Sequence, residues 1–188
     1  MKQNNIISIL KNNPIIPVAT IDELSKVDEY YKTLVHQNIN CIEITLRNDI
    51  SWDAIQMFKK KYGSSFKVGV GTITSKNQID KCKDIGVDFM VSPGYTPTLI
   101  DCFEESNIPF LPGISTPSEI IDGINKNLKY FKFFPANIFG GLKALITYQS
   151  VFKGIYFCPT GGLNSSNFDD YLNLSNVISV GGSWLLNE

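Results

Sequence analysis

One short segment places a carboxylate and a guanidinium on the same side of an otherwise apolar run. In residues 42–47 (IEITLR), alternate side chains of an extended strand point to opposite faces, so Glu43, Thr45 and Arg47 share one face. A parallel strand that is buried on both faces should be almost continuously apolar. Charged groups on its inner face are therefore either paired or used in chemistry. Two interpretations follow: a structural Glu–Arg ion pair, and a carboxylate that transfers protons.

A single lysine interrupts the aromatic segment 130–134 (YFKFF). On the edge of an open sheet, Lys132 would face water and protect that edge from pairing with other chains. A closed barrel has no edges, and there Lys132 would point inward, beside Phe134. Desolvation favours the neutral form of an amine, and a neutral amine can attack a carbonyl carbon to form a Schiff base. Lys132 is thus a candidate nucleophile.

Glycine pairs occur after the last two apolar runs of the chain. Gly161-Gly162 follows Thr160, and Gly181-Gly182 precedes Ser183. In (β/α)8 barrels, the loops after strands 7 and 8 often bind phosphate, because glycine lets backbone N–H groups approach the anion. Ordinary tight turns explain one such pair equally well, but two in these positions favour a phosphate site.

Two further turns, Gly71-Thr72 and Ser92-Pro93-Gly94, place small or rigid residues after the third and fourth runs. They would leave space for a ligand at the same mouth, and ordinary turn chemistry is the alternative.

The elements that must position these residues alternate between short apolar runs and segments of helical period. The eight expected strands are 15–19, 41–46, 66–71, 89–91, 109–111, 130–134, 155–158 and 177–180. The capping signals expected to open helices are Thr20 with Glu23, Ser75 with Gln78, Thr96 before Pro97, and Thr116-Pro117 with Glu119. Strands that alternate with helices form a parallel sheet. Eight of them favour an α/β fold of the (β/α)8 (TIM) barrel type over a doubly wound sheet of five or six strands.

Composition and charge exclude several classes of protein. The 188 residues are 43% hydrophobic and 19% charged, with a net charge of −1, which predicts one globular domain, 1–188. The absence of a basic cluster argues against nucleic acid or membrane surfaces as partners. No apolar run is long enough to span a bilayer and no signal sequence is recognisable, so a cytoplasmic protein is expected.

The cysteines and the histidine provide no recognisable metal site. Four cysteines are widely spaced without a C-x-x-C motif, and they are Cys41, Cys82, Cys102 and Cys158. The single histidine, His36, lies at an expected helix C-terminus, and any Ser-His-Asp triad would have to use it. We therefore expect reduced, mostly buried thiols and no metal.

Taken in order, these motifs resemble the 2-keto-3-deoxy-6-phosphogluconate (KDPG) aldolase family, which also includes 4-hydroxy-2-oxoglutarate (KHG) aldolases. The matching segments are 42–47 (IEITLR), 68–72 (VGVGT), 91–94 (VSPG), 109–116 (PFLPGIST), 131–136 (FKFFPA), 157–162 (FCPTGG) and 181–184 (GGSW). They run through nearly the whole chain. The resemblance implies a class I aldolase on a (β/α)8 barrel that needs no metal or cofactor. It also implies a homotrimer and a role in carbohydrate metabolism through the Entner–Doudoroff pathway.

The resemblance also implies roles for individual residues. Lys132 would form the Schiff base and Glu43 would transfer protons during cleavage of KDPG to pyruvate and glyceraldehyde 3-phosphate. Arg47 and Thr72 would hold the carboxylate of the pyruvyl group, and Thr160 would lie beside the aldehyde portion. The other expected substrate-binding residues are Gly161, Gly162, Gly182 and Ser183 at the phosphate, with Phe134 and Pro93 lining the cavity.

Two departures from the family pattern affect these expectations. The family continues with another helix after G-G-S-W, so a short or missing last helix is expected here. An N-terminal helix around Ile6 and Leu10, or a neighbouring subunit, would then cover that flank. Some relatives carry a basic residue at the end of strand 1, where this chain has Ala19 and Thr20, and the preferred substrate stays open.

The sequence leaves three alternatives open. The first is an aldolase for another 2-oxo acid, such as 4-hydroxy-2-oxoglutarate. The second is a phosphosugar-binding barrel without catalysis, which the presence of Glu43, Arg47 and Lys132 disfavours. The third is a metal-dependent aldolase, which the single histidine disfavours.

Overall fold

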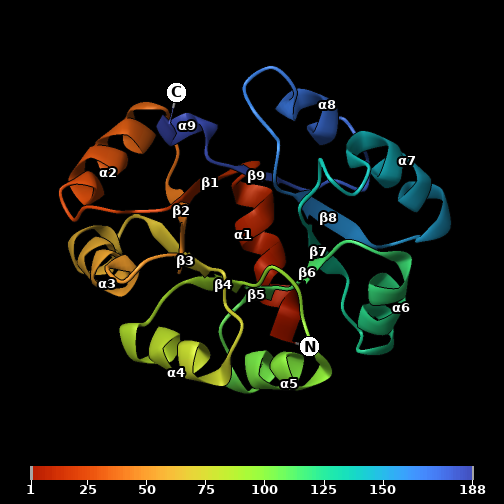
Figure 1. Ribbon diagram of the computed structural model, residues 1–188, viewed down its shortest axis with the longest axis horizontal. Helices are drawn as coiled ribbons and strands as arrows, with labels where there is room; N and C mark the ends of the chain where they lie inside the picture. The colour runs from red at the N-terminus through yellow and green to blue at the C-terminus, as the bar shows by residue number, and fades with distance from the viewer. Residues whose placement is uncertain (1, 188) are drawn as a thin grey trace.

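The computed structural model describes residues 2–187, and its parallel strands lie inside a ring of helices (Figure 1). One sheet has six strands in the order β5-β4-β3-β2-β1-β9, and the other has three in the order β6-β7-β8. The strands are β1 (Ile15–Ala19), β2 (Cys41–Thr45), β3 (Lys67–Gly71), β4 (Phe89–Val91), β5 (Phe110–Leu111), β6 (Gly113–Ile114), β7 (Tyr130–Phe133), β8 (Tyr156–Pro159) and β9 (Val180–Gly182). The fold is thus of the α/β class, with parallel strands curled into a barrel-like wall.

The structure corrects the expected strands in two places. The fifth expected strand, 109–111, corresponds to β5, and a second short strand that was not expected, β6, follows after Pro112. Proline has no backbone N–H to donate to a ladder, which accounts for a break at this residue. The last strand begins at Val180 rather than at 177. The segment 177–181 meets the β8 region through two isolated bridges, Phe157 with Val177 and Thr160 with Gly181.

The helices alternate with the strands along the chain. They are η1 (Lys2–Asn5), α1 (Ile6–Asn12), α2 (Lys26–His36), α3 (Ser51–Tyr62), α4 (Lys76–Ile85), α5 (Pro97–Ser106), α6 (Pro117–Asn125), α7 (Gly141–Val151), α8 (Phe168–Leu172) and α9 (Trp184–Asn187). The short last helix expected from the sequence corresponds to α9. No helix within residues 2–187 is long and apolar enough to cross a membrane.

One of the two expectations for the flank of the last strand is wrong. Helix α1 does not cover that flank. It crosses the middle of the view in Figure 1, and its Ile6 and Leu10 pack with Ile16, Cys41 and Val91 inside the strands. Its apolar side chains therefore close one end of the strand wall. Helix α9 instead packs beside β1 and α2.

The outer and inner faces of the strands pack into two different apolar clusters. Ile42 and Ile44 of β2 belong to the large cluster between strands and helices, whereas Cys41 belongs to the smaller inner cluster. Glu43 and Thr45 are also buried, at 3% and 1% exposure, on the face opposite Ile42 and Ile44. The predicted inward orientation of Glu43 is confirmed by this alternation.

Three of the four predicted capping signals open helices, at Ser75, Thr96 and Thr116. The fourth, at Thr20, is wrong. Helix α2 begins six residues later, at Lys26, after Ser25. The Thr20 hydroxyl instead pairs with the hydroxyl of Thr45, at 2.8 Å. Its place directly after β1 puts it within reach of the neighbouring strand β2, which offers a tertiary partner in place of the helical one.

Candidate active site

A lysine and a glutamate form a buried ion pair in the interior of the strand wall. Lys132 Nζ of β7 donates a hydrogen bond to Glu43 Oε1 of β2, at 3.0 Å, and the two side chains are only 6% and 4% exposed. Because β2 and β7 belong to different sheets, the side chains meet across the interior. The partner of Glu43 is thus Lys132, and the Glu43–Arg47 ion pair considered from the sequence is not formed.

This pair is chemically suited to proton transfer. Burying two charges costs several kcal/mol per ion, at an order of magnitude, before their attraction is counted. Within the described residues, the Glu43 carboxylate accepts a hydrogen bond from Lys132 alone, so it has unused acceptor capacity. Transfer of one proton along the 3.0 Å contact would produce a neutral amine beside a carboxylic acid. A nucleophile and a general acid are then adjacent.

Strand β3 leaves room for the carboxylate through Gly71. A Cβ atom at this position would lie 2.1 Å from Glu43 Oε1, so any other residue would displace the carboxylate. The next residue, Thr72, has a φ of 67°, an unfavourable conformation for a β-branched side chain. Backbone strain of this kind is common at functional sites, and here it directly follows the glycine beside Glu43.

Phe134 connects the ion pair to a cavity. Lys132 Nζ lies 5.2 Å from the centre of the Phe134 ring, which is within the range of a cation–π contact. Phe134 also lines a cavity of about 370 Å³. The other lining residues are Val18, Thr20, Arg47, Thr160, Gly161, Gly162, Leu163, Gly182 and Ser183.

The cavity brings together most of the substrate-binding residues predicted from the sequence. Thr72 and Pro93 do not line it; they follow β3 and β4, at the same end of the strands. Val18, Thr20 and Leu163 line the cavity without having been predicted. For Thr20, the signal available in the sequence was its place immediately after the first strand.

Arg47 lies at the mouth and lines the cavity, as expected, but on a turn after β2 rather than on the strand itself. The strand β2 ends at Thr45, and the backbone then turns, with Arg47 N donating to Thr45 O at 3.1 Å. The Arg47 side chain is therefore exposed at the mouth rather than buried in the interior. Within the described residues it forms no ion pair, and its guanidinium is available to an anion in the cavity.

The two glycine turns lie side by side at the cavity. The isolated bridge between Thr160 and Gly181 joins them, and Thr160 is 6% exposed. Gly162 has a φ of 76°, and a Cβ atom there would lie 2.4 Å from Asn137 Cβ. A Cβ atom at Gly182 would overlap the Trp184 ring. The contact with Trp184 is thus sufficient to explain why glycine occupies position 182. Only its place in the cavity wall connects Gly182 with ligand binding.

A thiol nucleophile is disfavoured. Cys158 is paired in register with Lys132 on the neighbouring strand, and burial raises the pKa of its thiol to about 11. Burial also raises the pKa of Cys82 to about 12. Both thiols stay protonated near neutral pH, and a protonated thiol is a poor nucleophile.

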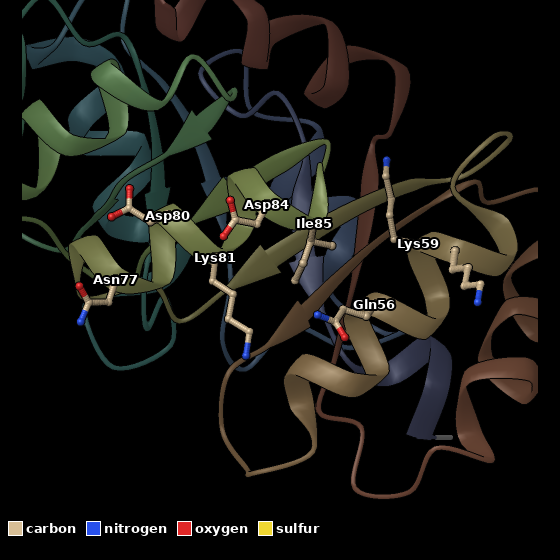
Figure 2. Close-up of a pocket in the computed structure, with 8 residues that line it drawn as sticks. Gln56, Lys59, Asn77, Asp80, Lys81, Asp84 and Ile85 are labelled. Atoms are coloured by element: carbon tan, nitrogen blue, oxygen red, sulfur yellow. The ribbon is translucent and has the colours of Figure 1, made fainter.

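The largest cavity lies away from these residues, between α3 and α4, with a volume of about 870 Å³. Figure 2 shows that it is lined by side chains of the two helices, among them Gln56, Lys81 and Ile85. Lys59 and Asp80 at its border are engaged in ion pairs with Asp88 and Lys76. The groove lacks the buried polar groups that converge in the smaller cavity.

The chain is similar over nearly its whole length to one family of enzymes. A family model described as KDPG and KHG aldolase matches residues 6–188. The chain is 40% identical to the KHG/KDPG aldolase of Escherichia coli (strain K12) over 179 residues, covering 95% of this chain and 84% of the relative. It is 40% identical to the 2-dehydro-3-deoxy-phosphogluconate aldolase of Dickeya dadantii (strain 3937) over 178 residues, covering 95% and 83%.

Two solved structures are similar throughout. The KDPG aldolase from Legionella pneumophila, with pyruvate captured as a covalent carbinolamine intermediate, has a TM-score of 0.92 and 35% identity, covering 97% of this chain and 88% of its own. The aldolase of Zymomonas mobilis ZM4 with 3-phosphoglycerate has a TM-score of 0.92 and 34% identity, covering 97% and 86%.

Proposed function

The chain belongs to the KDPG and KHG aldolase family, and from this premise we propose that it is a class I aldolase that cleaves KDPG to pyruvate and glyceraldehyde 3-phosphate. The observation that carries the proposal is the buried Lys132–Glu43 pair, which adjoins a cavity through Phe134. An amine that attacks a ketone must be unprotonated, and a carboxylate at hydrogen-bond distance can accept its proton.

The reaction begins with the neutral amine of Lys132. Its Nζ adds to the C2 ketone of the substrate to form a carbinolamine, and loss of water leaves a protonated imine. A carbinolamine of pyruvate was captured in the related Legionella enzyme. Glu43 supplies the proton that the departing hydroxyl needs, and the imine then acts as an electron sink.

Cleavage of the C3–C4 bond follows. Glu43 takes the proton of the C4 hydroxyl, the bonding pair moves into the imine to form an enamine, and the aldehyde is released. The enamine is protonated at C3 by Glu43, and hydrolysis of the imine returns pyruvate and the free lysine. One carboxylate suffices for these steps because it lies 3.0 Å from the nitrogen that holds the substrate.

The cavity residues orient the substrate. Arg47 binds the carboxylate of the pyruvyl group through its planar guanidinium, with Thr72 nearby at the end of β3. Thr160 lies beside the aldehyde portion. Gly161, Gly162, Gly182 and Ser183 hold the phosphate through backbone N–H groups. Binding of the distant phosphate positions the reacting carbons, which raises the rate of the chemical step.

The architecture belongs to the same proposal. Counting β5 and β6 as one strand interrupted at Pro112, the strands close into an eight-stranded (β/α)8 barrel, supported by the bridges between β8 and the β9 segment. A homotrimer is proposed as well, and it is supported by exposed apolar side chains at Ile138, Phe139 and Ile146, at 72%, 42% and 54% exposure. The single domain, the cytoplasmic location and the Entner–Doudoroff role stay predictions.

Trapping with borohydride tests the chemistry directly. Incubation with pyruvate and borohydride should reduce the imine to a stable amine, and peptide mass spectrometry should locate it on Lys132. Lys132→Ala should abolish the adduct, whereas Lys129→Ala, an exposed lysine next to the same strand, should retain it. No adduct in folded wild-type protein would instead support a phosphosugar-binding barrel without catalysis.

A second substrate is favoured by one comparison. The Escherichia coli relative is named KHG/KDPG aldolase, so 4-hydroxy-2-oxoglutarate is a second candidate substrate for the same site. Steady-state kinetics with both acids would decide the preference. A higher kcat/KM for 4-hydroxy-2-oxoglutarate would reassign the principal substrate without changing the mechanism.

A further inference from the structure

Two threonine hydroxyls form a hydrogen-bonded chain at the mouth of the cavity. Thr45 Oγ1 donates to the backbone oxygen of Ala19 at 3.0 Å, and it lies 2.8 Å from Thr20 Oγ1. Thr45 is buried, with 1% exposure, whereas Thr20 is exposed and lines the cavity. The chain therefore runs from the cavity wall into the interior.

The number of hydrogens on each hydroxyl determines which group donates in each of these hydrogen bonds. Each hydroxyl has one hydrogen to donate and two lone pairs that accept. A carbonyl oxygen only accepts, so the Thr45 hydrogen is committed to Ala19 O. The 2.8 Å contact must then use the hydrogen of Thr20, with Thr45 as the acceptor. Thr20 Oγ1 consequently presents only lone pairs to a ligand in the cavity.

An oxygen that only accepts distinguishes between ligand groups. It binds an O–H or N–H group, and it repels the oxygens of a carboxylate or a phosphate, which have no hydrogen to offer. Facing such an oxygen, the Thr20 hydroxyl gains no hydrogen bond, so this contact is less favourable than one with an O–H donor. This part of the wall therefore selects a hydroxyl.

The topology places Thr20 between the two anion-binding parts of the cavity. Strand β1 pairs with β2 on one side, whose following loop holds Arg47, and with β9 on the other, where Pro17 is paired with Gly182. In the proposed substrate, the pyruvyl carboxylate and the phosphate are the two ends. The hydroxyl-bearing carbon C5 lies between the bond that breaks and the phosphate.

We propose that Thr20 is a specificity-determining residue that accepts a hydrogen bond from the C5 hydroxyl of the substrate, with Thr45 as the positioning residue that holds its proton. The inference rests on the proposed function and names how the site chooses among 2-oxo acids. At C5, 4-hydroxy-2-oxoglutarate carries a carboxylate, which Thr20 disfavours, whereas KDPG carries a hydroxyl.

The test compares two aldehydes in the addition direction with pyruvate. Glyceraldehyde 3-phosphate provides the future C5 hydroxyl, and its 2-deoxy analogue, 3-oxopropyl phosphate, lacks it. Thr20→Val keeps the shape of the side chain and removes the acceptor. The ratio of kcat/KM for the two aldehydes should fall by about 3- to 10-fold, as expected for one lost hydrogen bond. Thr98→Val, an exposed threonine on α5, is the matched control and should keep the ratio.

Thr45→Val provides an independent readout. This change removes the acceptor of the Thr20 hydrogen, so the Thr20 hydroxyl is free to donate to a carboxylate. The activity toward 4-hydroxy-2-oxoglutarate should then rise. The ratio of kcat/KM for KDPG to that for 4-hydroxy-2-oxoglutarate should fall. Thr20→Ser keeps the hydroxyl, so unlike Thr20→Val it should retain the wild-type ratio for the two aldehydes. Equal losses for both aldehydes in Thr20→Val, or an unchanged ratio of the two acids in Thr45→Val, would overturn the inference.

Failure of the proposed function gives a different result. If wild-type protein forms the pyruvate adduct on Lys132 and cleaves KDPG, the proposed function holds, and only the ratios decide the role of Thr20. If wild-type protein forms no adduct and cleaves neither acid, the proposed function fails and the inference falls with it. The borohydride trap therefore separates the two outcomes.

Discussion

Two lysine–carboxylate pairs in this protein have the same chemistry and different surroundings. Lys132 and Glu43 meet in the interior at 3.0 Å, and Glu43 has Lys132 as its only hydrogen-bond partner within residues 2–187. Asp88, between α4 and β4, is bound by Lys59 at 2.5 Å, by Lys67 at 3.2 Å and by the backbone N–H of Val68 at 3.0 Å. One carboxylate has a single partner, and the other is fully engaged.

The difference lies in how many fixed donors surround each carboxylate. Burial raises the pKa of the Asp88 carboxyl, but hydrogen bonds from Lys59, Val68 and Lys67 outweigh burial and leave the pKa below its ordinary value. Asp88 thus stays ionised and joins α3, β3 and β4. Glu43 has no such set of fixed donors, which agrees with the proton-transfer role that we propose for it.

The largest expected effect is the loss of the nucleophile. Lys132→Ala should lower kcat for KDPG cleavage on the order of 10⁴-fold or more, because no other amine in the site can form the imine. Lys59→Ala, the matched change in the second pair, should lower stability and keep kcat within a few-fold. Steady-state kinetics and thermal unfolding of both variants measure the contrast. Comparable losses of kcat in the two variants would contradict the assignment of the nucleophile to Lys132.

The next effect concerns the carboxylate. Glu43→Gln keeps the size of the side chain and removes its capacity to accept a proton, so kcat should fall by about 10²- to 10⁴-fold. Asp88→Asn provides the control and should leave kcat nearly unchanged at equal folded fraction. A wild-type kcat in Glu43→Gln would show that another group transfers the protons.

The smallest effect is a pH-dependent change in stability. Because the pKa of Asp88 is lowered in the folded state from the ordinary value of 3.8, its ionised form stabilises the fold above that value, and this contribution is lost as pH falls through the lowered pKa. At pH 7, Asp88→Asn should lower the free energy of unfolding by about 1–3 kcal/mol. Urea titrations of both proteins should show this gap shrinking below pH 4. A gap that is constant down to pH 2 would contradict the role of the charge.

Several features of the site could be predicted from short stretches of sequence. The alternation in 42–47 placed Glu43 on the inner face, and the single lysine in an aromatic run identified Lys132. The glycine turns were recognised by their position after the last strands. Each of these depends on the residue and its immediate neighbours, and the two-residue period of a strand carries that information reliably.

Other features could not be predicted because they depend on where a strand ends. Arg47 shares the period of Glu43 and was expected near the mouth, but β2 stops at Thr45, so a turn and not the strand places its guanidinium there. Thr20 carried a capping pattern with Glu23, yet its hydroxyl bonds to Thr45, which no local pattern indicates. For Thr20, a tertiary contact replaced the local preference.

The sequence by itself determined which side chains face inward and where helices begin at Ser75 and Thr116, because strand alternation and capping boxes act over two to four residues. Only the tertiary structure decided that Glu43 pairs with Lys132, 89 residues away, and that the hydroxyls of Thr20 and Thr45 meet, 25 residues apart. These partners meet only when distant strands pack around a common interior. The identity of a contact across that interior is a property of the closed fold and not of either segment.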